Sequence, residues 1–210
     1  MSEQLHFTLK PENPNSFFYF ISHSGVFSAY CRAQQIIEEY QSINSKFSIV
    51  VFSGPRGSGK THLVEAIKSA LPKIEVCIFD FAEYMPSENF DQEIIREFIN
   101  IYEFARTNNK LLLVTMRTSP DNKLINEHIR TRLSVSRTES LDYPQESELP
   151  LVLQSLSERY NLTLSAKTIS YLVQHLPLDT LSFESIISKV NEESLKNKIP
   201  VKLGLLKRFI

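Results

Sequence analysis

The residues from Gly54 to Thr61 read Gly-Pro-Arg-Gly-Ser-Gly-Lys-Thr and match the phosphate-loop pattern G-x-x-x-x-G-K-[ST]. In this pattern the glycines let backbone N–H groups turn toward phosphate oxygens. Lys60 would reach the β- and γ-phosphates, and the Thr61 hydroxyl would bind Mg²⁺. A glycine turn before a helix is the simpler alternative, but a β-type apolar run precedes the loop and an amphipathic segment follows it. The sequence therefore predicts binding of ADP or ATP with Mg²⁺.

A site of this kind also needs an acidic residue at the end of a neighbouring strand, to hold Mg²⁺ through water. Asp80 meets this requirement, because it follows four apolar residues, Val76 to Phe79. A cap on a turn is the alternative for Asp80. A hydrolysing site usually adds a second carboxylate beside the first, to orient water. Phe81 occupies that position, and Glu83 shares its strand face. The site is predicted to hold a nucleotide better than to hydrolyse it.

The hydrophobic pattern predicts the elements that position these residues. Buried strands are expected over 47–52, 75–81 and 110–116, with a weak fourth over 135–143, and helices over 28–40, 60–71 and 91–106. Only helices follow, over 147–160, 165–176 and 180–196, with a short last helix after Pro200. Alternating strands and helices followed by helices alone indicate an α/β domain with a helical subdomain behind it. The boundary is expected near Tyr143 and Pro144.

Composition narrows the class of protein further. The 210 residues carry a formal net charge of −1, so no global basic field draws the chain onto DNA, and DNA contact would be local or through a partner. The longest apolar runs are too short to span a bilayer, and the first residues lack the core of a signal peptide. Two cysteines argue against a disulfide scaffold and fit a reducing cytoplasm.

The phosphate loop resembles that of the DnaA/Hda-like proteins, a group of AAA+ ATPases that includes the bacterial replication initiator DnaA. The resemblance rests on the run Gly59 to Leu63 with Glu65-Ala66-Ile67 behind it, and on Asp80-Phe81-Ala82-Glu83. It implies a P-loop AAA+ parallel sheet sandwich followed by a small all-helical lid. The nucleotide contacts that pattern and resemblance together predict are Gly54, Pro55, Arg56, Gly57, Ser58, Gly59, Lys60, Thr61 and His62, with Thr61 and Asp80 as the Mg²⁺ ligands.

The resemblance implies two further interaction sites. Arg130-Thr131-Arg132-Leu133 resembles the box that carries an arginine finger, and Arg132 is the predicted finger that acts in trans. The N-terminal residues Gln4, Leu5, Phe7 and Leu9 resemble the peptide that docks in the sliding clamp of DNA polymerase. A first edge strand with alternating apolar residues is the alternative for this segment. The expected division is a clamp-docking arm over 1–15, a nucleotide-binding domain over 16–143 and a lid over 144–210.

Four departures from the resemblance put hydrolysis by this chain in doubt. Leu181 stands where the group has an arginine that touches the phosphates, Met116-Arg117 replaces a small residue and an acid, and His128 replaces another arginine. The connection from Lys60 to Asp80 is also short, so the sheet is expected to lack an edge strand.

The combined expectation is a cytoplasmic regulator of replication initiation, with little or no ATPase activity of its own. It would bind nucleotide and the clamp and promote hydrolysis of ATP held by DnaA, as a possible homo-oligomer. One alternative is an adaptor that binds clamp and nucleotide without finger chemistry. Another is a P-loop ATPase of helicase-loader type that uses Glu83.

Overall fold

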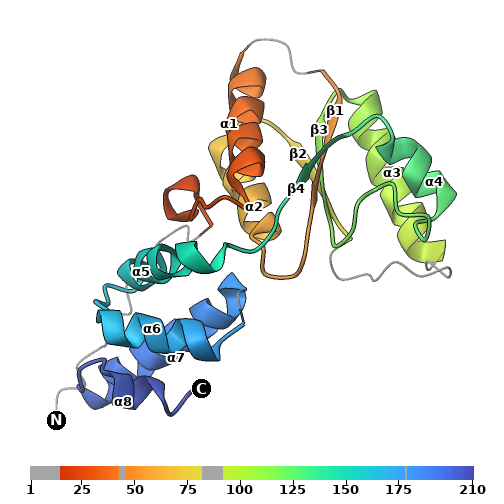
Figure 1. The fold of residues 1–210 in the computed structure, drawn as a ribbon. Helices are drawn as coiled ribbons and strands as arrows, with labels where there is room; N and C mark the ends of the chain where they lie inside the picture. The colour runs from red at the N-terminus through yellow and green to blue at the C-terminus, as the bar shows by residue number, and fades with distance from the viewer. Residues whose placement is uncertain (1–14, 43–45, 82–91, 178) are drawn as a thin grey trace. The chain divides into compact units, whose positions relative to one another are not determined.

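The computed structural model of the chain describes residues 15–42, 46–81, 92–177 and 179–210. The described residues divide into two compact units at Tyr143 and Pro144. Figure 1 shows the mixed strand and helix content of the first unit and the purely helical content of the second. Each unit has buried apolar side chains of its own.

A parallel sheet of four strands is the centre of the first unit. Its strands, in the order β2-β3-β1-β4, are β1 (Ser48–Ser53), β2 (Val76–Asp80), β3 (Leu111–Met116) and β4 (Arg137–Ser140). Because all pairings are parallel, the carboxyl ends of the strands meet at one edge of the sheet. Ligands of open parallel sheets bind at that edge.

Helices cover both faces of this sheet. Helices α1 (Phe27–Gln41) and α2 (Lys60–Ala70) lie on one face, and α3 (Gln92–Thr107) and α4 (Glu127–Leu133) on the other (Figure 1). Alternate residues of β1 pack against the helices on opposite faces of the sheet. Val50 and Phe52 pack with α1 and α2, whereas Ile49 and Val51 pack with α3 and α4. This double burial explains why the strand reads as a continuous apolar run.

The expected loss of an edge strand is confirmed between Lys60 and Asp80, where every residue is described. Helix α2 ends at Ala70, and β2 begins at Val76 after a short turn. Strand β2 therefore stands at one end of the sheet, beside β3, over the described part of the chain.

The second unit has helices and no strand over its described residues, 144–177 and 179–210. Its helices are α5 (Leu149–Arg159), α6 (Ala166–His175), α7 (Thr180–Asn197) and α8 (Leu203–Leu206), and a 3-10 turn, η2 (Glu146–Glu148), precedes them. Side-chain caps begin two of these helices: Ser165 accepts from the N–H of Thr168, and Asp179 accepts from the N–H of Ser182. Leu153, Leu156 and Phe183 are among its fully buried side chains.

These elements confirm the expected α/β class and the helical region after it. Strands and long helices begin and end within about three residues of the predicted bounds. The 3-10 turn η1 (Phe17–Tyr19) and helix α4 were not expected. Helix α4 has only seven residues and starts where the Asn126 side chain caps the N–H of His128, so it carries too little periodicity to be recognised.

Candidate nucleotide-binding site

The loop from Gly54 to Gly59 leaves the carboxyl end of β1 and enters α2. Gly54 has φ +151° and Gly59 has φ +97°, a backbone region that favours glycine. A Cβ on Gly54 would lie 2.0 Å from the carbonyl oxygen of Leu141, so the loop and the segment after β4 touch backbone to backbone. Glycine is required here for close approach as well as for conformation.

Lys60 is buried at the start of α2, with only 4% of its surface exposed. Its Nζ donates hydrogen bonds to the carbonyl oxygens of Gly54 (2.7 Å) and Pro55 (2.6 Å). Burial lowers the pKa of Lys60 to about 8; the Asp80 carboxylate opposes this shift, and the Arg117 guanidinium adds to it. The ammonium group is thus held inside the loop, where a bound phosphate would replace part of its lost hydration.

Asp80 lies exposed at the carboxyl end of β2, in register with Thr115 of β3. The Thr115 hydroxyl donates to a carboxylate oxygen of Asp80, which orients it. Thr61 lies exposed in the first turn of α2. A hydroxyl and a carboxylate are ligands that suit Mg²⁺, which usually keeps several waters and bridges to phosphate. The described residues hold no group of three or more His, Cys, Asp or Glu able to bind a metal, so phosphate and water would have to complete the coordination.

The residue after Asp80 points into the core instead of into the site. Phe81 is 2% exposed and packs its ring against Phe79 and Phe98, with centroids 4.5 Å and 5.1 Å away. It therefore has a structural role, as its apolar type indicates. Glu83 lies outside the described residues.

The segment before α1 packs against the phosphate loop, a contact that the sequence pattern does not predict. The Phe20 ring lies beside Gly59, edge-on to His62 and stacked on Tyr30. The His62 Nε2 is 3.0 Å from the carbonyl oxygen of Ser16. Aromatic rings beside a phosphate loop are suited to stack on a nucleobase. The signal was the aromatic run Phe17 to Phe20, directly before a predicted helix.

The segment after β4 contacts the loop from another side. The Tyr143 hydroxyl donates to the carbonyl oxygen of Arg56 (2.8 Å). The N–H of Leu141 donates to the carbonyl oxygen of Ser53 (2.7 Å). The N–H of Asp142 donates to the carbonyl oxygen of Gly25, which links this segment to the one before α1. Three segments far apart in the sequence therefore form the surroundings of the loop.

Arg132 is engaged with α3 of its own chain. Its Nη2 lies 3.4 Å from a Glu103 carboxylate oxygen, its Nη1 donates to the His128 carbonyl, and its guanidinium lies over the Tyr102 ring, 5.4 Å from the centroid. Three-quarters of the side chain is buried. Arg130, on the same helix, makes no ion pair with the described residues. The structure thus places the predicted finger in a packed position and leaves its neighbour more available.

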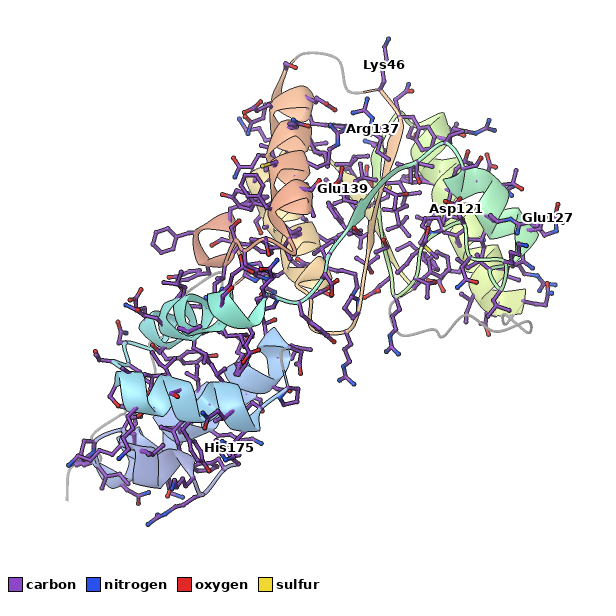
Figure 2. All side chains as sticks on the ribbon, in the orientation of Figure 1. Lys46, Asp121, Glu127, Arg137, Glu139 and His175 are labelled. Atoms are coloured by element: carbon purple, nitrogen blue, oxygen red, sulfur yellow. The ribbon has the colours of Figure 1, made fainter. Side chains whose placement is uncertain are left out.

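Arg137, the third arginine of this region, is directed to another part of the unit. It lies on β4 and reaches Glu39 of α1 at 3.5 Å, while Glu139 accepts from the Ser28 hydroxyl at 2.7 Å. Figure 2 labels Arg137 and Glu139 on β4, beside α1. These contacts tie α1 to the sheet edge.

The remaining predicted features are the clamp-docking segment and Leu181. The proposed clamp-docking residues, Gln4, Leu5, Phe7 and Leu9, lie outside the described residues. Leu181 lies in the first turn of α7, where it is 47% exposed.

Comparison of the fold with known structures gives a consistent result. Domain III of the replication initiation protein DnaA from Thermotoga maritima superposes with a TM-score of 0.75 at 16% identity, over 94% of this chain and 97% of that one. DnaA from Aquifex aeolicus with bound AMPPCP gives 0.67 at 16% identity, over 87% and 67%. The Holliday junction branch migration motor RuvB from Thermotoga maritima gives 0.64 at 14% identity, over 93% and 71%.

The chain has the AAA+ fold. The expected AAA+ sheet sandwich with helices after it is therefore confirmed, and the fold is like that of DnaA domain III. No family model and no curated protein matches the sequence. None of the described helices combines the length and hydropathy needed to cross a membrane.

Proposed function

We propose that this AAA+ chain binds ADP or ATP, with Mg²⁺ held by Thr61 and Asp80, and acts as a regulator of replication initiation. The observation that carries nucleotide binding is the buried Lys60, whose ammonium is held in a loop of positive-φ glycines at the carboxyl edge of the sheet. When bound, Mg²⁺ would neutralise phosphate charge. The chain's own residues would bind the phosphates and orient the carboxylate through Thr115.

The regulatory part of the proposal concerns the initiator DnaA. Arg132 would reach ATP held by DnaA and stabilise the charge that develops during phosphoryl transfer. Residues 1–15 would hold the sliding clamp through Gln4, Leu5, Phe7 and Leu9, so that the effect follows replication that has begun. Residues 144–210 would act as the lid. Phe81 supports a role on another protein's nucleotide, because it fills the place of a water-orienting carboxylate with a buried ring.

The test loads purified DnaA with labelled ATP and follows its conversion to ADP with and without clamp on DNA. We expect this chain to accelerate conversion only with clamp, and expect the Gln4/Leu5 double alanine variant to lose the effect. Arg132→Ala should lose it as well, and Arg130→Ala serves as the matched control on the same helix. If Arg130→Ala lost the activity and Arg132→Ala kept it, the finger would be Arg130.

A second candidate is an adaptor that binds clamp and nucleotide without finger chemistry. The contacts of Arg132 with Glu103 and Tyr102 favour it, because an arginine held within its own domain is less ready to enter another protein's site. Clamp binding without any change in DnaA-bound ATP, in the same assay, would support the adaptor over the regulator.

A further inference from the structure

The outer edge of β2 is a part of the sheet that the proposed function does not use. Over the described part of the chain, β2 pairs with β3 alone. The N–H of Phe81, directly after the strand, donates to the carbonyl oxygen of Thr115 on β3 at 2.8 Å. Backbone groups of a strand alternate in direction from one residue to the next. Cys77 and Phe79 therefore direct their backbone groups toward β3, and Ile78 directs its own groups outward.

Val76 shares the outward direction of Ile78. No hydrogen bond within 15–42, 46–81, 92–177 and 179–210 uses the backbone N–H or carbonyl oxygen of either residue. Both side chains are half-buried, on the face of the sheet that α1 and α2 cover. Unpaired backbone groups along an apolar edge strand are a template for pairing with a further strand.

The strand at the other end of the sheet, β4, has a different composition. It reads Arg-Thr-Glu-Ser, and its charged side chains contact α1: Arg137 reaches Glu39, and Glu139 accepts from the Ser28 hydroxyl. Charged residues and short length protect such an edge from association. Strand β2 reads Val-Cys-Ile-Phe-Asp, with no lysine, arginine or proline and with its one charge at the last residue. One edge of the sheet is thus protected, and the other is suited to pairing.

Strand β2 is complementary to a second copy of itself in the antiparallel direction. A twofold axis beside Ile78 would place this residue opposite Ile78 of the second copy, and each outward N–H would face the other carbonyl oxygen. This register overlaps all five residues of the strand. The amino end of β2 has a net positive charge from Lys73 and Lys110 against Glu75. Antiparallel pairing brings this end beside Asp80 of the second copy, so charges of opposite sign approach.

We propose that β2 is a dimerisation edge, which pairs in the antiparallel direction with β2 of a second copy of this chain. The two sheets would join into one, and the half-buried side chains of Val76 and Ile78 would lose contact with water, which is favourable. A contact made mainly by one strand is small, so the dimer is expected to be reversible. The inference is independent of nucleotide binding, because Val76 and Ile78 lie outside the phosphate loop.

The experiment measures the mass of the full-length chain by sedimentation equilibrium, without nucleotide, from low to high micromolar concentration. We expect the mass of wild type to rise from that of one chain toward that of two. Ile78→Lys and Ile78→Glu should each stay monomeric, because like charges would meet at the twofold axis. An equal mixture of the two variants should form dimers again, because opposite charges then meet. Thr138→Lys, an exposed position on β4, is the matched control and should dimerise as wild type does.

Hydrogen exchange of wild type adds a measurement that needs no variant. The N–H groups of Cys77 and Phe79 bond to β3, so their protection should not depend on protein concentration. Exchange at the Ile78 N–H should slow by about tenfold or more as the dimer forms.

Three results would overturn the inference. The first is a wild-type chain that stays monomeric, or a dimer in which the Ile78 N–H exchanges as fast as in the monomer. The second is a mixture of Ile78→Lys and Ile78→Glu that stays monomeric although both variants are folded by circular dichroism. The third is protection of the Ile78 N–H that appears only when clamp or DnaA is added, which would assign this edge to another protein.

Discussion

At the level of single residues, the buried ammonium of Lys60 is the feature on which the candidate site depends. Its lysine type and its place after Gly59 were predicted from the phosphate-loop pattern. Its neighbours were less predictable, because Phe20, Leu141 and Tyr143 reach the loop only through tertiary contacts. A pattern in the sequence identifies residues that act together along the chain, and packing adds those that arrive from elsewhere.

The low pKa of Lys60 predicts a pH dependence of stability in the nucleotide-free protein. Between the folded pKa of about 8 and the ordinary value of 10.5, the unfolded chain holds a proton that the folded chain has released. The free energy of unfolding contributed by Lys60 therefore rises with pH across this window, by up to about 3 kcal/mol. We expect the free energy of unfolding of wild type, measured with urea, to increase relative to that of Lys60→Met between pH 7 and pH 10.

The variant is needed in this comparison because other groups titrate in the same range. Burial raises the pKa of Tyr40 and of Cys77. A group whose pKa is raised by folding lowers the free energy of unfolding as the pH rises, because the unfolded chain releases the proton first. Both groups are present in wild type and in Lys60→Met, so their effects cancel in the difference. A difference that is flat between pH 7 and pH 10 would contradict the prediction.

The contacts of Arg132 predict a cost in stability as well as any effect on DnaA. Replacing Arg132 by alanine removes the ion pair with Glu103 and the cation–π contact with Tyr102. Together these contacts contribute about 1 kcal/mol, since both are partly exposed. Arg130→Ala should change the free energy of unfolding by less than about 0.5 kcal/mol. If the two substitutions changed the free energy of unfolding in urea equally, the contacts of Arg132 would contribute nothing to stability.

At the level of elements, the predictability of each strand follows its burial. The central strands β1 and β3 are buried on both faces and read as long apolar runs, so their bounds were nearly right. Strand β4 consists of Arg137, Thr138, Glu139 and Ser140, and its pattern is weak. Polar and charged residues are typical of short strands at the end of a sheet. The sequence predicted a fourth strand over 135–143 only weakly, because the position of β4 comes from pairing with β1.

The capped start of α7 gives a prediction for the helical unit. The Asp179 carboxylate accepts from the N–H of Ser182 (2.8 Å) and from its hydroxyl (2.7 Å). Asp179→Ala should lower the stability of this unit by about 1 kcal/mol, whereas Asp179→Asn should keep most of it, because asparagine caps equally well. Hydrogen exchange of amides in 180–197 measures the effect. Equal protection in all three proteins would rule out a stabilising cap.

At the level of the whole molecule, the described residues hold separate buried cores. The two sides of the sheet supply the cores of Asn15–Tyr143, and residues such as Leu153, Leu156 and Phe183 are buried in Pro144–Ile210. The loop of Lys60 belongs to the first unit, as do Phe20, Leu141 and Tyr143, which contact it. The phosphate loop therefore belongs to one unit only, and the other unit has a core of its own.

This separation predicts that ADP protects the two units unequally. A ligand that binds only the folded state, present at a hundredfold its Kd, stabilises that state by about 2.7 kcal/mol. Because Lys60 and the glycine loop lie in the first unit, hydrogen exchange should slow by about a hundredfold for core amides of β1 and β3. Amides of α5 and α6, in the proposed lid, should slow much less, because Leu181 at the start of α7 brings no positive charge to the phosphates. Lys60→Met should remove the protection of β1 and β3. Equal slowing in both units would instead mean that the nucleotide binds them together, and the helical unit would then be part of the site.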